Sequence, residues 1–137
     1  MSGTPRPSVL FACVHNAGRS QMALGWFEHL ARGRADAYSG GSAPADTVNP
    51  SAVAVMREVG IDISARTPKR WTDVLIERVD VVVTMGCGDE CPYFPGTRYE
   101  DWAVPDPAGL AVDDVRPIRD EIERRVRALL EELDLSS

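Results

Sequence analysis

The chain has 137 residues, 44% of them hydrophobic and 26% charged, a composition that fits a single globular domain with a buried core. Its formal charge of −6 lacks the basic surplus on which nucleic-acid binding relies, so no nucleic-acid partner is expected. No stretch is long and apolar enough to span a membrane, and residues 1–7 form a polar, flexible lead-in without a signal region, so the sequence predicts a cytoplasmic protein with no membrane partner.

The first half of the chain predicts strands alternating with helices. Residues 9–12 form an apolar run of strand formers. Met22, Trp26 and Leu30 then recur every four residues, which predicts a helix. A second strand is expected at residues 37–39, ending before a pair of glycines. A second helix should begin at Pro50, because proline suits a first helical position.

The second half continues the same pattern. A short helix is expected from Thr72, followed by a nearly continuous apolar strand at residues 79–85 and a short strand at residues 98–102. The C-terminal segment predicts the clearest helix, with one apolar stripe formed by Val115, Ile118, Ile122, Val126, Leu129, Leu130 and Leu133. Nearly continuous apolar strands are typical of a parallel sheet that helices cover on both faces.

A cysteine stands where the first strand gives way to the first helix. Cys13 is followed by five residues and then by Arg19 and Ser20. A loop ahead of a helix N-terminus directs backbone N–H groups and partial positive charge at one spot, which suits a tetrahedral oxyanion and favours a thiolate. A buried structural cysteine is the alternative. The expected oxyanion-binding residues are Val14, His15, Asn16, Ala17, Gly18, Arg19 and Ser20.

The other two cysteines lie together beyond the strand at residues 79–85. Cys87 and Cys91 are separated by three residues, and Gly86 and Gly88 make their segment easy to deform. Open α/β sheets build their sites at the carboxyl ends of the strands, so these thiols could face Cys13. Half a zinc site or two incidental thiols are the alternatives, but a single Cys-x₃-Cys pair is a weak zinc signal and no metal is expected.

Residues 8–27 resemble the anion-binding loop of the low-molecular-weight protein tyrosine phosphatases, and in particular of the arsenate reductases that share their fold. The similarity continues in order through most of the chain, at Asn49-Pro50 and at residues 60–64, 82–84, 106–109 and 116–122. It implies a single α/β domain over residues 1–137, with three α/β/α layers and a central four-stranded parallel sheet. No cofactor is implied.

The resemblance to thioredoxin-coupled arsenate reductases also implies a thiol relay. Cys13 would attack arsenate, for which phosphate and sulfate would compete. Cys87 would then attack the Cys13 sulfur so that arsenite leaves, and Cys91 would release Cys13 by forming a Cys87–Cys91 disulfide. Thioredoxin is the expected reductant of that disulfide. A low-molecular-weight thiol with a glutaredoxin-like partner is the alternative donor.

Asp106 is the expected general acid. In the family, the aspartate of this Asp-Pro pair protonates the leaving oxygen; on the residues alone, an ordinary Asp-Pro turn is the alternative. The phosphatases typically continue with aromatic residues that wall the phosphotyrosine cleft, whereas Ala108 and Gly109 follow here. This difference favours a small inorganic substrate over a phosphotyrosine or a small phosphomonoester.

The chain departs from the family at three places. Gly18 replaces a second loop cysteine that many members carry, and the spacing from Cys87 to Cys91 is shorter than in some relatives. Leu24 occupies the position of an acidic side chain that helps some relatives bind potassium, so no bound ion is expected. Besides the phosphatase, the remaining alternative is a protein that traps trivalent arsenic or a metal through its thiols without turnover.

Overall fold

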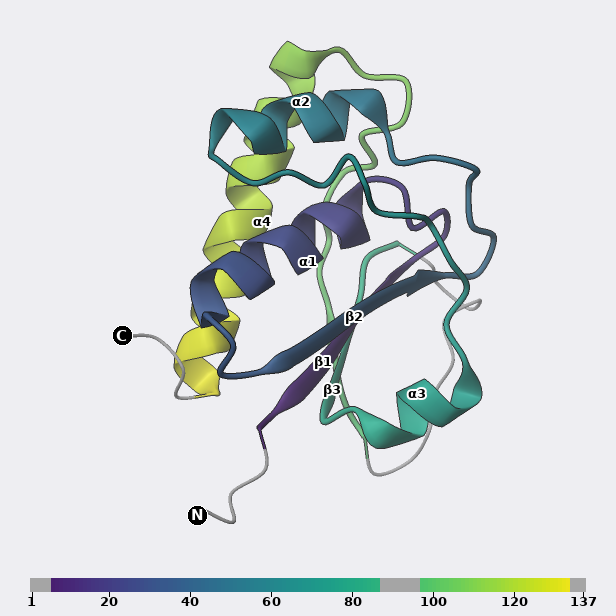
Figure 1. Ribbon diagram of the computed structural model, residues 1–137, viewed down its shortest axis with the longest axis vertical. Coiled ribbons are helices and arrows are strands. Elements are labelled where there is room, and N and C mark those ends of the chain that lie inside the picture. Colours follow the sequence, from purple (N-terminus) through teal and green to yellow (C-terminus); the bar gives the residue numbers. More distant parts are fainter. Residues whose placement is uncertain (1–5, 87–96, 134–137) are drawn as a thin grey trace.

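The computed structural model describes residues 6–86 and 97–133 (Figure 1). Within these ranges the predicted strands and helices are confirmed, with small shifts of their ends. In chain order they are β1 (Ser8–Cys13), α1 (Arg19–Ala31), β2 (Asp36–Gly41), α2 (Pro50–Glu58), α3 (Asp73–Arg78), β3 (Val81–Thr84), β4 (Arg98–Asp101) and α4 (Val112–Glu132).

The strands form one parallel sheet in the order β2-β1-β3-β4. Strand β1 is buried from Val9 to Cys13, as its uninterrupted apolar sequence predicts for a central strand. Because all the strands run in the same direction, their carboxyl ends meet at one edge of the sheet. Cys13, Thr84 and Asp101, the last residues of three neighbouring strands, therefore lie at the same edge.

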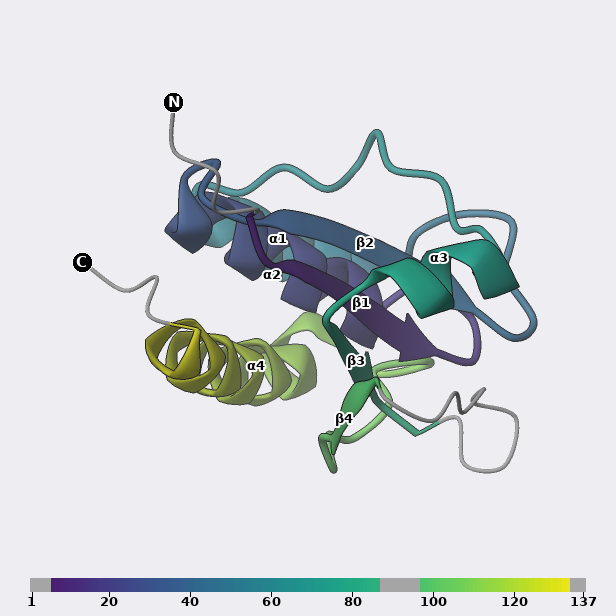
Figure 2. The same cartoon turned by 90° about the horizontal axis from the view of Figure 1, so that it is seen from below.

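Helices cover both faces of the sheet, which confirms the three-layer architecture. Helices α1, α2 and α4 lie on one face and α3 on the other (Figures 1 and 2). Alternate residues of β1 point to the two layers, since Phe11 joins the cluster under α1 and α4 while Leu10 joins the cluster under α3. No helix within the described ranges has the length and hydropathy of a membrane span.

The strand expected to end before the two glycines instead continues through them. Gly40 and Gly41 pair with Ala12 and Cys13 in β2. A Cβ atom on Gly41 would lie 2.4 Å from the carbonyl oxygen of Val14. Here glycine allows the strand to pass directly beside the loop that follows β1, so it marks a close backbone approach and not a strand end.

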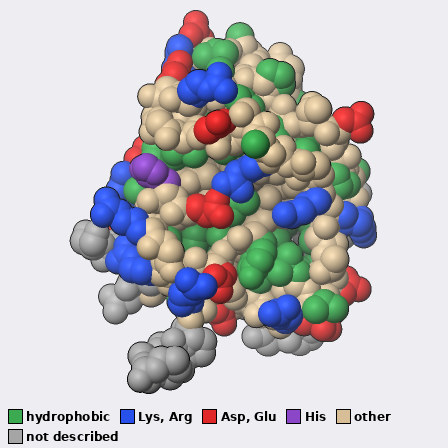
Figure 3. Space-filling model, in the orientation of Figure 1, with side chains coloured by type: hydrophobic (Ala, Val, Ile, Leu, Met, Phe, Trp, Pro, Cys, Tyr) green, Lys and Arg blue, Asp and Glu red, His purple; other side chains and the backbone are tan. Residues whose placement is uncertain are grey.

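Surface charges of both signs are interspersed over the face seen in Figure 3. One set of ion pairs joins α2 to α4. Arg116 donates to both carboxylate oxygens of Glu58, from Nε at 3.0 Å to Oε1 and from Nη2 at 2.7 Å to Oε2. Arg119 Nη1 adds a bond of 2.9 Å to Oε1 and another of 2.9 Å to the Val55 carbonyl. A single carboxylate thus connects two helices on the same face of the sheet.

Glu58→Gln is expected to weaken the acid dependence of stability. The hydrogen bond from Arg116, aided by Arg119 and opposed by desolvation, lowers the pKa of Glu58 from 4.5 to about 2. A lowered pKa stabilises the fold above the unfolded value, and that contribution is lost as the pH falls from about 4.5 through about 2. Urea unfolding across this range should therefore show a shallower pH slope for Glu58→Gln than for the unmodified chain. Glu123→Gln, whose pair with Arg127 lies within α4, should keep the original slope.

Candidate active site

The loop between β1 and α1 folds back over the Cys13 sulfur. Cys13 is buried, with 2% of its surface exposed. The backbone N–H of Asn16 donates to its Sγ at 3.3 Å, and the Ser20 hydroxyl lies 2.9 Å from the same sulfur. Asn16 has a φ of 52°, a left-handed conformation that asparagine tolerates better than most residues. The turn at Asn16 is what directs its N–H back toward the strand end.

Helix α1 presents its positive end to this loop. Its first intrahelical bond runs from the N–H of Met22 to the carbonyl of Gly18, so the N–H groups of the first turn have no acceptor within the helix. The first turn contains no acidic side chain, and Gly18 provides no side-chain cap. The partial positive charge of the helix end is therefore not neutralised locally and can stabilise a bound anion.

Arg19 is held beside the sulfur by the segment after β4. Its guanidinium is buried; Nη1 donates to the Val104 carbonyl at 3.2 Å, and Nη2 lies 3.7 Å from Asp106 Oδ2. Gly86, which has a φ of 85°, packs against the same group, because a Cβ atom there would lie 2.4 Å from Nη1. The chain therefore enters residues 87–96, which lie outside the described ranges and contain Cys87 and Cys91, directly from contact with Arg19.

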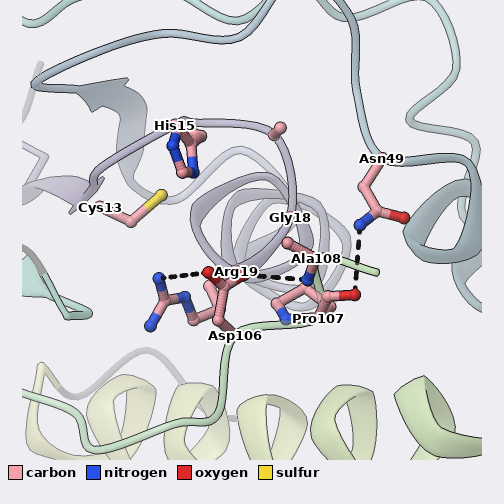
Figure 4. Close-up of a pocket in the computed structure, with 9 residues that line it drawn as sticks. Cys13, His15, Gly18, Arg19, Asn49, Asp106, Pro107 and Ala108 are labelled. Carbon is pink, nitrogen blue, oxygen red and sulfur yellow. Dashed lines mark hydrogen bonds and ion pairs between the residues drawn. The ribbon is translucent and has the colours of Figure 1, made fainter. Parts of the chain in front are cut away.

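Asp106 lies across the pocket from Cys13 (Figure 4). Its Oδ1 accepts the backbone N–H of Ala108 at 3.0 Å, and its side chain is 48% exposed. The Asp-Pro turn that was the alternative for this residue is thus present. The same turn directs the second carboxylate oxygen toward Arg19, so the turn and a role in the site are compatible.

The pocket in Figure 4 brings together most of the residues predicted for the site. It is a small cavity of about 30 Å³. Among the described residues its wall has no Tyr, Phe or Trp, which leaves space for a small inorganic group at the loop. Its lining residues are Cys13, His15, Ala17, Gly18, Arg19, Asn49, Asp106, Pro107 and Ala108.

Three of the predicted loop residues lie outside the lining. Asn16 and Ser20 are fully buried behind the sulfur and brace it. Val14 is half-buried and packs against the cluster on the α3 face, while its carbonyl accepts the N–H of Ala43 at 2.8 Å. His15, in contrast, is exposed and lies at the rim of the pocket.

Asn49 lines the pocket although it is not among the predicted site residues. Its Oδ1 caps α2 by accepting the N–H groups of Ser51 at 2.8 Å and Ala52 at 3.2 Å. Its other groups face the pocket, since its N–H donates to the Ala17 carbonyl at 2.8 Å and Nδ2 donates to the Pro107 carbonyl at 3.4 Å. Asn49 therefore connects the loop to the Asp106 segment. An asparagine before a helical proline predicts the cap, but not the second pair of contacts.

The parts of the chain that the structure describes contain no cluster of three or more His, Cys, Asp or Glu residues suited to holding a metal ion. Leu24, at the position where some relatives have an acidic side chain, is buried in the core cluster with 4% of its surface exposed.

Comparison with known proteins agrees with this geometry. The model of the family described as "Low molecular weight phosphotyrosine protein phosphatase" matches residues 8–136. An arsenate reductase of Staphylococcus epidermidis is 37% identical, over 90% of this chain and 95% of that protein.

Two solved structures are similar over nearly the whole fold. A thioredoxin-dependent arsenate reductase of Corynebacterium glutamicum superposes with a TM-score of 0.85 and 40% identity; the match covers 99% of this chain and 66% of that longer chain. An arsenate reductase in its phosphate-binding state gives a TM-score of 0.81 and 34% identity, over 93% of this chain and 98% of the other. This chain therefore belongs to the low molecular weight phosphotyrosine protein phosphatase family, among relatives that are arsenate reductases.

Proposed function

We propose that this protein reduces arsenate to arsenite with Cys13 as the nucleophile. The observation that supports this most directly is a buried sulfur that faces Arg19 and Asp106 across a small pocket and receives a backbone N–H bond of 3.3 Å. Arg19 and the free N–H groups of α1 would bind the oxygens of a tetrahedral anion. The named relatives are arsenate reductases, which directs the choice of anion.

In the first step the Cys13 thiolate attacks arsenic. A sulfur–arsenic bond forms and an arsenic–oxygen bond breaks, and Asp106 gives its proton to the departing oxygen so that water leaves. Arsenic stays in the +5 state in this step. Hydrogen bonds from Ser20 and Asn16 would stabilise the thiolate both before this attack and when Cys13 is later released.

The second step is the reduction. The Cys87 thiolate attacks the Cys13 sulfur, so a sulfur–sulfur bond forms and the sulfur–arsenic bond breaks. The bonding pair stays on arsenic, which leaves as arsenite in the +3 state, while the two thiols are oxidised to a disulfide. Cys91 then attacks Cys87 and frees the Cys13 thiolate, and an external dithiol reduces the resulting Cys87–Cys91 disulfide.

Thioredoxin is the proposed external dithiol, because a terminal Cys87–Cys91 disulfide suits a dithiol protein and a similar solved structure is named as thioredoxin-dependent. Phosphate and sulfate are the proposed competitors, since they present the same tetrahedral oxygens to the loop. A relay that needs thiols in the reduced state fits the cytoplasm.

The test is steady-state turnover of the purified protein with thioredoxin, its reductase and NADPH. NADPH oxidation should require arsenate, and arsenite should form in the same amount. A parallel assay with glutathione and glutaredoxin identifies the donor. Hydrolysis of an aryl phosphate without arsenite formation would instead assign the phosphatase activity of the family name. Unchanged arsenate and an unchanged thiol count would indicate a binding protein.

Gly18→Ala is expected to lower kcat/KM for arsenate. The added Cβ atom would lie 2.5 Å from Pro107 Cγ, so the Pro107 segment would have to shift and take the neighbouring Asp106 with it. Displacing a catalytic group by about 1 Å can cost up to about a hundredfold in rate, and we expect a loss of at least about tenfold.

Gly60→Ala is the matched control for this measurement. Gly60 has a φ of 84° and open space around it, so the substitution should lower the melting temperature without moving the pocket. If Gly18→Ala retained the original kcat/KM, the close packing of Pro107 against Gly18 would not be what positions Asp106.

A further inference from the structure

Gln21, in the first turn of α1, contacts Asn16, whose backbone N–H donates a hydrogen bond to the Cys13 sulfur. Its side chain is buried, with 1% exposed, and Nε2 lies 3.1 Å from both the backbone carbonyl oxygen and the side-chain Oδ1 of Asn16. Asn16 in turn holds a left-handed φ of 52° and donates its N–H to the sulfur. One buried amide thus binds two oxygens of the residue that turns the loop toward Cys13.

The direction of the hydrogen bonds behind the sulfur follows from the backbone N–H of Lys69, which can only donate. It donates to Asn16 Oδ1 at 2.9 Å, so Asn16 Nδ2 must face Ser20, where it donates to Oγ at 2.7 Å. The Ser20 oxygen, which accepts from Asn16, lies 2.9 Å from Cys13 Sγ; because a thiolate has no proton to donate, the Ser20 hydroxyl is the donor in this contact whenever Cys13 is ionised. Two donors on the sulfur favour its ionised form.

The orientation of the Gln21 amide follows from the same chain. Both Asn16 oxygens are acceptors, so the NH₂ group of Gln21 must face them. This leaves Gln21 Oε1 buried, with no hydrogen-bond partner among the described residues. A buried acceptor without a partner is destabilising, and methionine would fill a similar volume in a helix without that cost. The donor half of the amide is therefore what this position requires.

We propose that Gln21 is a positioning residue for the Cys13 thiolate. Its amide holds Asn16 in the left-handed conformation and fixes the direction of the Asn16 side chain. Asn16 then directs two hydrogen-bond donors at the thiolate: its own backbone N–H and, by holding Ser20, the Ser20 hydroxyl. The inference rests on the part of the proposed function that makes Cys13 the nucleophile, and it does not depend on which oxyanion is the substrate.

The test measures Cys13 by itself. In a Cys87→Ser/Cys91→Ser background Cys13 is the one remaining cysteine. Its alkylation rate with iodoacetamide, followed against pH, reports the thiolate fraction. Gln21→Met should raise the pH midpoint by about one pH unit, which means about tenfold less thiolate below the midpoint. An unchanged midpoint in a folded Gln21→Met protein would overturn the proposal.

The controls distinguish an effect of Gln21 on the position of Asn16 from other causes of a shifted alkylation midpoint, such as titration of another group or general disturbance of the core. The charged and titratable groups that line the pocket with Cys13 in the described part of the chain are His15, Arg19 and Asp106. The same rise in a His15→Gln background shows that imidazole titration is not its source; loss of the rise there would overturn the proposal. Met22→Leu, at a neighbouring and fully buried position, should leave the midpoint unchanged.

A second variant covers the case in which Gln21→Met fails to fold. Gln21→Glu keeps the shape of the side chain but places carboxylate oxygens against the two Asn16 acceptors, so it should also raise the midpoint. A midpoint equal to that of the unmodified Gln21 protein would overturn the proposal. Alkylation needs no arsenate, so absence of arsenate reduction would overturn the proposed function and leave this measurement intact.

Discussion

Cys13→Ser should abolish arsenate reduction and aryl phosphate hydrolysis together, to the background of each assay. In the proposed mechanism, both reactions begin with attack by the Cys13 sulfur on a tetrahedral centre. The positive charge of Arg19 and the helix end is enough to ionise a thiol but not a serine hydroxyl, which stays protonated. Among the described residues, no histidine or carboxylate is hydrogen-bonded to the residue 13 side chain to remove the hydroxyl proton. Parallel assays of arsenite formation and aryl phosphate hydrolysis measure the two losses.

The same variant should still bind the anion. Arg19, the N–H groups of α1 and the Asn49 contacts do not involve the sulfur, so calorimetric titration with inorganic phosphate should give a similar Kd for the Cys13→Ser and unmodified proteins. Retained binding with lost turnover separates the nucleophile from the binding groups. Turnover in either assay by Cys13→Ser would remove Cys13 from the chemistry altogether.

Most of the fold could be predicted from local patterns in the sequence. The apolar run before Cys13 and the stripe of α4 are signals that few other structures would satisfy, and both elements are present. The pair Gly40 and Gly41 shows the limit. Two glycines usually mark a strand end, but here the Trp71 backbone beside Gly40 and the Val14 carbonyl beside Gly41 leave no space for a Cβ atom, so the glycines allow the strand to continue past close neighbours.

The candidate site also has one part that the sequence predicts and one part that it does not. The position of Cys13, Arg19 and Ser20 between a strand and a helix predicts an anion-binding loop, because the helix end and the arginine act locally. The direction of the hydrogen bonds on the sulfur is set by Lys69, which is 53 residues away from Asn16. A contact over that distance in the chain has no local signal, so it requires the tertiary structure.

The contact of Gly86 with Arg19 bears on the relay. The proposal needs Cys87 to reach the Cys13 sulfur, and the chain leaves the described residues from a point in contact with the guanidinium that lines the same pocket. Arg19 therefore lines the pocket beside Cys13 and also contacts Gly86, the residue that precedes Cys87 in the sequence. The proposed oxidation step requires Cys87 to reach Cys13, whereas hydrolysis of a phosphate ester does not.

Cys87→Ser should consequently abolish multiple-turnover arsenate reduction and leave slow aryl phosphate hydrolysis at its original rate. In the proposed mechanism, hydrolysis uses only the loop, Arg19 and Asp106, while reduction also needs a second thiolate that attacks the Cys13 sulfur and leaves the electron pair on arsenic. Arsenite formation and aryl phosphate hydrolysis, measured on the same preparation, give the comparison.

Cys91→Ser is the informative partner of that variant, because it stops the relay one step later. It should release about one arsenite per protein molecule in a single turnover and then hold a Cys13–Cys87 disulfide, which peptide mapping detects. Cys87→Ser should release none and form no such bond. Loss of hydrolysis as well as reduction in Cys87→Ser would mean that Cys87 supports the pocket itself. It would contradict the proposal that Cys13 is the nucleophile and that Cys87 acts only in the later oxidation step.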